Sequence, residues 1–245
     1  MNSPIEWLAT RPFAHRGLHD ITAGAPENSM AAFEAAIKAS YPIELDVQTS
    51  RDGRAMVFHD LVLTRMTGAD GFLRETDAAK LDGLRLRESQ QTIPTLAAVL
   101  DLINGQVPVI VEIKSLAGPI GHLETAVRPI LGSYPGIFAV TSFEARSLTW
   151  FKEREPNWPR GQNVGVRRLP DFKPWWRRLA WRYLYDVDGA QPDFVVYDGR
   201  DLPNWAAKRV RAAGKPLLTF TIRDRDQMDR LAPHADNIIF EGFRP

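Results

Sequence analysis

The chain of 245 residues contains no cysteine. Disulfide bonds, thiolate metal sites and a cysteine nucleophile are therefore excluded. A charge excess is also lacking, because 31 Lys and Arg residues face 30 Asp and Glu residues for a net charge of +1. No overall field attracts nucleic acid or a membrane, so we predict no nucleic-acid partner.

Long apolar runs are missing as well. No uninterrupted stretch approaches the roughly 20 residues that a membrane-spanning helix needs. The first ten residues have neither the basic segment nor the apolar segment of a signal peptide. We therefore expect a cytoplasmic protein. The sequence does not indicate the oligomeric state.

Short apolar runs recur along the chain, and most are nearly continuous in hydrophobic character. Such runs are typical of strands that are buried on both faces of a parallel sheet. Helical patterns fill most of the gaps, as where Thr95 can cap a helix that begins at Leu96. The predicted strands are 12–15, 43–48, 108–114, 137–141, 163–167, 194–198, 217–222 and 237–241.

This alternation predicts the α/β fold class and a single (β/α)8 barrel of the TIM type. An open doubly wound sheet is the alternative, but no Gly-x-Gly-x-x-Gly turn follows the first strand. The long polar stretch 60–92 predicts an inserted segment after the second strand. The stretch 168–190 is aromatic and basic and predicts a second excursion. We predict one domain, 1–245.

Carboxylates interrupt two of the apolar strands. Glu44 and Asp46 are two residues apart, so both side chains point to the same face of one strand, and Glu112 repeats the pattern on the next. Burying neighbouring carboxylates is costly, and a divalent cation removes that cost. Three carboxylates form a hard oxygen site that suits Mg²⁺ or Ca²⁺. The alternative is a structural network in which Lys114 and Arg16 pair with the acids.

Two histidines follow predicted strands. His15 ends the first strand, and His59 follows the short strand 55–58. Barrel enzymes build their sites at the carboxyl ends of strands, and two histidines can serve as acid and base. His19, His122 and His234 are predicted to be surface or packing residues.

Charged and polar residues lie beside these positions. Arg16 can form a fork to phosphate oxygens or a salt bridge to a site acid. Glu27 and Asn28 precede a predicted helix, which either Asn28 or Ser29 can cap.

Together these segments resemble the glycerophosphodiester phosphodiesterase family. The resemblance is strong in the first half of the chain and rests in the second half on Thr-Ser-Phe (141–143) and Leu-Thr-Phe-Thr-Ile (218–222). The matching segments of the first half are Phe-Ala-His-Arg-Gly (13–17), Pro-Glu-Asn-Ser (26–29), Ala-Phe-Glu-Ala-Ala (32–36), Ile-Glu-Leu-Asp-Val (43–47), Asp-Gly-Arg-Ala-Met-Val-Phe-His-Asp (52–60), Leu-Thr-Arg-Met-Thr-Gly (63–68), Ile-Pro-Thr-Leu (93–96) and Val-Glu-Ile-Lys (111–114).

The resemblance implies metal-dependent hydrolysis of small glycerophosphodiesters to sn-glycerol 3-phosphate and an alcohol, in lipid and glycerol metabolism. It implies that His15 and His59 are the general acid and base. It implies that Mg²⁺ or Ca²⁺ is bound by the three acids Glu44, Asp46 and Glu112. It also places Arg16, Glu27 and Lys114 at the metal and phosphate.

The sequence departs from the family pattern around the expected pocket for the alcohol. The family often has Gly-Gly or Gly-Ala after His-Arg, whereas here Leu18-His19 follow Gly17, and Phe240-Glu241 replace the usual Thr-Asp. Phe220 occupies the place of a common tryptophan, and we assign it to the substrate pocket. These departures concern the substrate and leave the phosphodiester chemistry in place.

Two other functions remain open. A phospholipase D-type phosphodiesterase could act on lysophospholipids at a membrane surface through 168–190, where tryptophan and arginine occur together. Packing of these aromatics on the barrel is the favoured alternative. A non-catalytic barrel that binds phosphorylated polyols should have lost a ligand or a histidine, yet all five are present.

Overall fold

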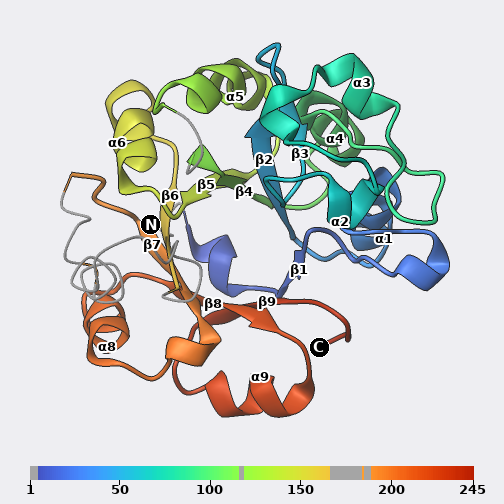
Figure 1. Cartoon of the computed structure of the whole chain (residues 1–245). Helices are drawn as coiled ribbons and strands as arrows, with labels where there is room; N and C mark the ends of the chain where they lie inside the picture. The colour runs from blue at the N-terminus through green and yellow to red at the C-terminus, as the bar shows by residue number, and fades with distance from the viewer. Residues whose placement is uncertain (1–4, 116–118, 166–183, 185–188) are drawn as a thin grey trace. The chain divides into compact units, whose positions relative to one another are not determined.

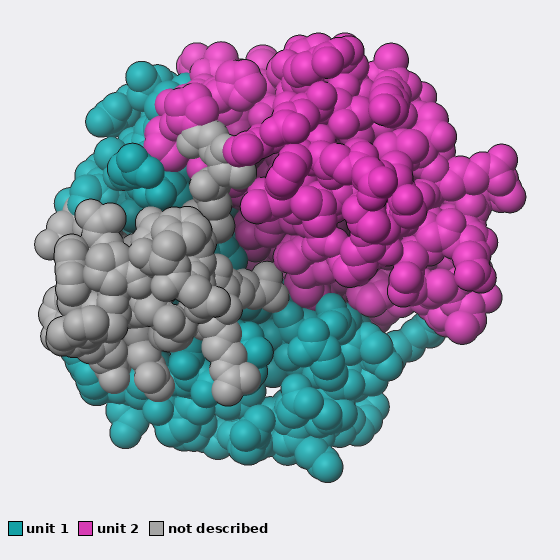
Figure 2. Space-filling model, in the orientation of Figure 1, with its two compact units in different colours: residues 1–12, 140–245 teal, residues 13–139 magenta. Residues whose placement is uncertain are grey.

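The computed structural model describes residues 5–115, 119–165, 184 and 189–245. Two compact units account for the chain, and Figure 2 draws them in different colours. One consists of residues 13–139, and the other of residues 1–12 and 140–245.

The first unit contains the strands that carry His15, Glu44, Asp46 and Glu112. Strands β1 and β4 each pair in parallel with β2, whereas β3 pairs with β2 in the antiparallel direction (Figure 1). Its elements are β1 (Phe13–His15), η2 (Ile21–Ala23), α1 (Met30–Lys38), β2 (Ile43–Thr49), β3 (Ala55–Val57), α2 (Thr64–Thr67), η3 (Leu73–Glu75), α3 (Ala78–Asp82), α4 (Leu96–Ile103), β4 (Val109–Ile113) and α5 (His122–Ser133), followed by the start of β5 (Phe138–Ser142).

Local sequence explains where these elements begin. Every residue of β4 is buried, which matches the unbroken apolar character of Val-Ile-Val-Glu-Ile. The Ser29 hydroxyl accepts a hydrogen bond from the Ala32 amide at the start of α1 (3.2 Å). Thr95 caps α4 in the same way through the Ala98 amide (3.2 Å), as the sequence predicts.

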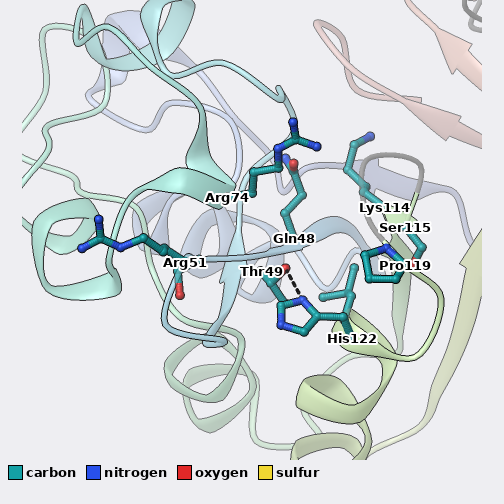
Figure 3. A pocket seen from close by; sticks show the side chains of 10 residues that line it. Gln48, Thr49, Arg51, Arg74, Lys114, Ser115, Pro119 and His122 are labelled. Atoms are coloured by element: carbon teal, nitrogen blue, oxygen red, sulfur yellow. Dashed lines mark hydrogen bonds between the residues drawn. The ribbon is translucent and has the colours of Figure 1, made fainter.

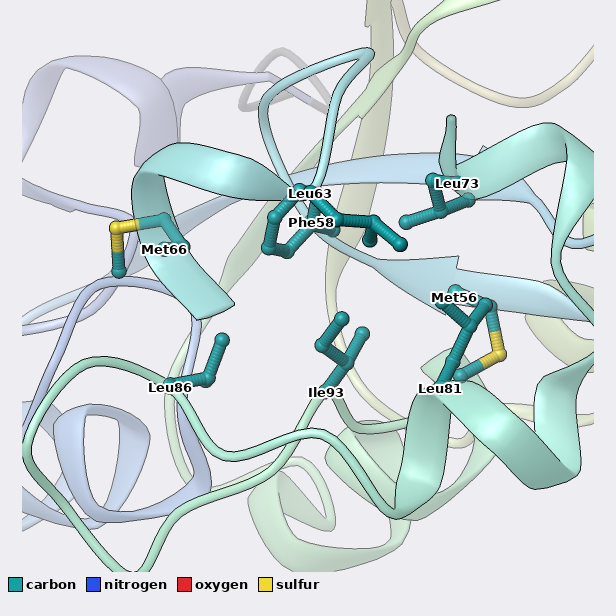
Figure 4. Packing of buried hydrophobic residues seen from close by; sticks show 8 residues of the cluster. All are labelled: Met56, Phe58, Leu63, Met66, Leu73, Leu81, Leu86 and Ile93. Carbon is teal, nitrogen blue, oxygen red and sulfur yellow. The ribbon is translucent and has the colours of Figure 1, made fainter. Parts of the chain in front are cut away.

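The inserted segment after β2 has a hydrophobic core of its own. Its sequence is polar overall, but side chains from β3 to the start of α4 pack together and exclude water (Figure 4). This packing holds the segment as an ordered structure, so the charged residues that it carries have fixed positions. The buried members are Met56, Phe58, Leu63, Met66, Leu73, Leu81, Leu86 and Ile93.

The second unit is a run of parallel strands with helices between them. Strands β6 to β9 pair in parallel in chain order, and β6 also pairs with the end of β5. Its elements are η1 (Glu6–Ala9), the end of β5, α6 (Ala145–Arg154), β6 (Arg160–Val164), β7 (Phe194–Asp198), η6 (Gly199–Asp201), α8 (Trp205–Ala212), β8 (Leu217–Ile222), α9 (Arg225–Leu231) and β9 (Asn237–Phe240).

The fifth predicted strand is displaced. Its valines predict a strand at 163–167, whereas β6 is Arg160–Val164. Buried polar residues make up most of this strand, and the Gln162 amide donates to the carbonyl oxygens of Ser142 (3.1 Å) and Phe143 (3.3 Å). A hydrophobic pattern cannot reveal a strand whose buried side chains are polar but hydrogen-bonded.

The order of strands and helices along the chain confirms the predicted fold class, a single (β/α)8 barrel of the TIM type with a segment inserted after the second strand. The predicted excursion 168–190 lies outside the described residues except for Leu184 and its last two positions. Within the described part of the chain, no helix combines the length and hydrophobicity needed to span a membrane.

Candidate active site

Three carboxylates meet at the centre of the first unit. Glu44, Asp46 and Glu112 are only 4%, 1% and 7% exposed. Their ligand oxygens all lie within 4.8 Å of one another. Strand register causes this convergence, because Asp46 is paired with Glu112 across β2 and β4, and Glu44 lies two residues earlier on the same face. The structure thus brings together the three acids that the sequence predicts.

Two cations contact the acids. The Lys114 ammonium donates to Asp46 Oδ1 (3.1 Å) and to Glu112 Oε1 (2.9 Å). The Arg16 guanidinium approaches Asp46 with its Nε 3.2 Å from Oδ2, and its Nη1 donates to Glu27 Oε1 (2.6 Å). The structure thus places Arg16 and Lys114 beside the acids, and their role at the phosphate stays a prediction.

Backbone conformation directs Arg16 toward the acids. Its φ angle is 58°, in the left-handed region that a residue with a side chain rarely adopts. The turn lets its amide donate to the Glu44 carbonyl (2.7 Å). Gly17 follows with a φ of 83°, and a Cβ there would lie 2.8 Å from the Ala32 carbonyl carbon. Glycine is therefore required at position 17 by close packing against α1 as well as by its positive φ.

Of the two N-cap candidates for α1, Ser29 takes that position, and Asn28 adopts a left-handed φ of 58°. The side-chain amide of Asn28 donates to Asp46 Oδ2 (3.0 Å) instead. Asn28 is therefore one of the residues that hold Asp46. Only its place beside Glu27, in a segment that resembles the family, could have indicated this from the sequence.

Burial and neighbouring charges shift the pKa values of Glu44 and Asp46 in opposite directions. Burial, with the negative charges of Asp46 and Glu112, raises the pKa of Glu44 well above its usual value. Burial also acts to raise the pKa of Asp46, but the positive charges of Lys114, His59 and Arg16 outweigh it and hold that pKa well below its usual range.

The donor set fits a divalent cation. Three carboxylates face only two cationic side chains, Lys114 and Arg16, and Arg16 is also paired with Glu27. Negative charge is therefore in excess at the cluster. All the donors are oxygens, which suits a hard cation such as Mg²⁺ or Ca²⁺. A cation at this position would relieve the repulsion that raises the pKa of Glu44.

The two predicted histidines reach the site by different routes. His15 ends β1 in register with Glu44, and its Nε2 lies 3.8 Å from Glu44 Oε2. His59 follows the antiparallel strand β3, which returns the chain so that the Phe58 amide donates to the Asp46 carbonyl (3.0 Å). The antiparallel pairing, rather than the carboxyl end of a barrel strand, therefore brings His59 toward the acids.

Gln48 fixes the loop that carries His59. It lies two residues beyond Asp46 on the same face of β2. Its side-chain amide donates to the carbonyl oxygens of Phe58 and Asp60, both at 2.8 Å. The sequence analysis did not identify Gln48, although its spacing of two from Asp46 was available as a signal.

A charged network continues from His59 into the inserted segment. His59 Nδ1 lies 2.7 Å from Asp60 Oδ1, and Asp60 is paired with the Arg65 guanidinium. Arg65 also donates to both oxygens of Glu27, at 2.7 Å and 2.9 Å. Although burial opposes it, these contacts together with Arg16 lower the pKa of Glu27 to about 2. Sequence reasoning missed Asp60 and Arg65.

Phe220 lies on β8 in the second unit. Its ring meets that of Phe143 edge to face, with centroids 6.0 Å apart. It also lines a pocket of that unit together with Asp198, Arg200 and Arg223. Its assignment to the substrate pocket stays a prediction.

These features define a class of protein. The fold is a (β/α)8 barrel, and its candidate site contains buried carboxylates, an arginine, a lysine and two histidines. These are the kinds of residue that a metal-dependent phosphodiester hydrolase uses. The sequence profile of the Glycerophosphoryl diester phosphodiesterase family matches residues 15–236. The chain belongs to this family, which is one of hydrolytic enzymes, and the predicted family and enzyme class are confirmed.

Individual relatives support the assignment. A glycerophosphodiester phosphodiesterase of Bacillus subtilis is 28% identical over 253 residues, covering 94% of this chain and 82% of that protein. The Bacillus subtilis protein YhdW is 34% identical over 168 residues, which span 65% of this chain and 66% of YhdW. A phosphodiesterase from Oleispira antarctica, solved with the product sn-glycerol-3-phosphate, is 25% identical with a TM-score of 0.76, covering 94% of this chain and 92% of that one.

Proposed function

We propose that the protein hydrolyses glycerophosphodiesters to sn-glycerol 3-phosphate and an alcohol, with Mg²⁺ or Ca²⁺ held by Glu44, Asp46 and Glu112. The observation that carries the proposal is the buried acidic triad, whose oxygens lie within 4.8 Å of one another beside Arg16 and Lys114. The Oleispira antarctica relative supports the product, because it was solved in complex with sn-glycerol-3-phosphate.

The phosphate of the substrate binds between the cations of the site. When bound, the divalent cation supplies positive charge that neutralises the non-bridging oxygens. Arg16 offers a planar fork of donors for the same oxygens, and Glu27 holds that fork in place through its 2.6 Å contact. Lys114 adds a third positive charge from β4 and at the same time fixes the orientation of Asp46 and Glu112.

His15 and His59 divide the proton transfers between them. One deprotonates the nucleophile, and the other protonates the leaving alkoxide, which is a poor leaving group near neutral pH. Asp60 engages Nδ1 of His59, so Nε2 is the nitrogen that faces the reaction. The nucleophile is either water or a neighbouring hydroxyl of the substrate, which forms a cyclic phosphate that water then opens.

The competing functions receive less support. The membrane-surface alternative rests on 168–190, most of which lies outside the described residues. A barrel that only binds phosphorylated polyols does not need a carboxylate held at Nδ1 of a histidine, which is the arrangement of Asp60 and His59. We therefore also propose that residues 1–245 act as one catalytic domain.

A product screen tests the function. The protein is incubated with glycerophosphocholine, glycerophosphoethanolamine, glycerophosphoinositol and lysophosphatidylcholine, first with Mg²⁺ and then with Ca²⁺. We expect sn-glycerol 3-phosphate and free headgroup from at least one of the first three. Release of headgroup from lysophosphatidylcholine alone would favour the phospholipase D-type function, and no product from any substrate would contradict the proposal.

A further inference from the structure

A second cavity opens beside the acidic site. It has a volume of about 220 Å³ and lies where β2 ends, between η3 of the inserted segment and the first turn of α5. Its lining includes Gln48, Thr49, Arg74, Lys114 and His122 (Figure 3). It is smaller than the roughly 300–1,000 Å³ of sites for drug-sized ligands, so it suits a small polar group.

The cavity adjoins the acidic site, because Lys114 lines the cavity and also donates to Asp46 and Glu112. Gln48, which also lines it, lies two residues beyond Asp46 on the same face of β2. For a diester whose phosphate lies at the acids and Lys114, as proposed above, this cavity is a neighbouring space for one of the two substituents.

One wall of the cavity is rigid. The Ser115 hydroxyl donates to the fully buried Glu124 carboxylate (2.5 Å), which also accepts from the Gly121 amide (2.7 Å). These bonds fix the start of α5 against the end of β4. They hold His122 opposite Thr49, with Nδ1 and Oγ1 3.4 Å apart (Figure 3). On this side of the cavity the start of α5 is thus tied to the end of β4.

The lining is hydrogen-bonding and positive. Arg74 and Lys114 only donate hydrogen bonds, whereas Thr49 and His122 can donate or accept. Figure 3 shows Gln48, Arg74 and Lys114 extending to one side of the cavity, with Thr49 and His122 facing each other on another side. The described residues that line it include no carboxylate and no Phe, Tyr or Trp. A quaternary ammonium group is recognised by aromatic faces, which this lining does not offer.

We propose that this cavity is the subsite for the alcohol of the diester and that it selects a hydroxyl-rich headgroup, such as a polyol, over a cationic one. The inference rests on the proposed function and deepens it. Hydroxyl groups both donate and accept, so they match the mixture of Thr49, His122 and the two cationic side chains. A cationic headgroup would find neither a carboxylate nor an aromatic face among the described lining residues, and it would approach two cationic side chains, although Lys114 pairs with Asp46 and Glu112 and Arg74 pairs with Glu75.

Competition between two diesters tests the subsite. We expect kcat/KM for glycerophosphoinositol to exceed that for glycerophosphocholine by about tenfold, the scale of one net hydrogen bond. Arg74→Gln and His122→Leu should each reduce this ratio by about three- to tenfold. Arg85→Gln is the matched control, because Arg85 is an exposed arginine of the inserted segment outside this cavity, and its ratio should equal that of the wild type.

The outcomes separate this inference from the proposed function. Hydrolysis of both diesters with equal efficiency, or a ratio that neither variant changes, would overturn the subsite and leave the function standing. If no diester is hydrolysed, the function fails, and saturation-transfer NMR with free myo-inositol and choline decides the subsite. A saturation-transfer signal from inositol that becomes weaker in His122→Leu would support the subsite. Equal signals from inositol and choline would contradict it.

Discussion

Arg65 binds Glu27 through two hydrogen bonds, from Nη2 to Oε1 (2.7 Å) and from Nη1 to Oε2 (2.9 Å). Arg65 belongs to the inserted segment, and Glu27 precedes α1 and holds Arg16. The same arginine also pairs with Asp60, which engages His59. The inserted segment therefore contributes directly to the position of the arginine and of a histidine in the candidate active site.

Replacing Arg65 by Gln should reduce kcat/KM for a glycerophosphodiester by about 10²-fold. His59 and Arg16 should lose their orientation together, because Asp60 and Glu27, which hold them, both lose a charged partner. Small displacements of catalytic groups are costly. Steady-state kinetics with circular dichroism would measure this loss in a folded variant. Arg85→Gln controls for loss of charge in the segment, and an Arg65 variant as active as the control would contradict the network.

Asp60→Asn should lower kcat by about 10²- to 10³-fold while KM changes little. The amide keeps the size of the side chain but no longer fixes the ring of His59 through a charged contact at Nδ1, an effect known for carboxylates that orient histidines. Separate determination of kcat and KM is the measurement. Asp70→Asn is a suitable control because Asp70 is exposed in the same segment. A change confined to KM would assign Asp60 to substrate binding instead.

Removing divalent cations should abolish activity, and Mg²⁺ or Ca²⁺ should restore it. Cation binding should also raise Tm, because a ligand that binds only the folded state stabilises it. In Glu112→Gln the cation should give a much smaller rise in Tm, since one of the three carboxylates of the cluster is lost. Thermal unfolding with and without each cation measures this independently of catalysis. Equal shifts in wild type and variant would place the cation elsewhere.

Acid should destabilise the protein in part through Glu27. Its folded-state pKa of about 2 lies below its ordinary value, so its contribution is present at neutral pH and is lost as the pH falls from about 4.5 to 2. Glu27→Gln should lower the free energy of unfolding at pH 7 by about 2 kcal/mol, and this difference should shrink toward pH 2. Urea unfolding at several pH values measures it.

Glu34→Gln serves as the control for that experiment, because Glu34 is exposed on α1. Its free energy of unfolding should follow that of the wild type at every pH. A Glu27 variant whose destabilisation does not change with pH would show that packing, rather than charge, explains its effect.

The sequence predicts the acids well because a spacing of two within a buried strand leaves one geometric outcome. Glu44, Asp46 and Glu112 follow directly from that rule once the strands are recognised. The (β/α)8 fold follows from the alternation of apolar runs and helical patterns. These features depend on local periodicity, which a single sequence contains.

Other features depend on tertiary contacts that no local pattern encodes. Asn28 could serve as an N-cap or as a partner of Asp46, and only the left-handed backbone at this residue decides between them. Arg65 reaches Glu27 across 38 positions of sequence. The strand β6 differs from its predicted position because its buried residues are mostly polar, and the Gln162 amide is satisfied by the carbonyl oxygens of Ser142 and Phe143.

The central claim is that the two histidines act on a phosphodiester held at the acidic cluster. The most direct test follows glycerophosphodiester hydrolysis by phosphorus NMR, with the cation present, in wild type, His15→Ala and His59→Ala. We predict that wild type forms sn-glycerol 3-phosphate and that each variant, with its fold intact, is slower by about 10²- to 10⁴-fold. Wild-type rates in either variant would contradict the claim.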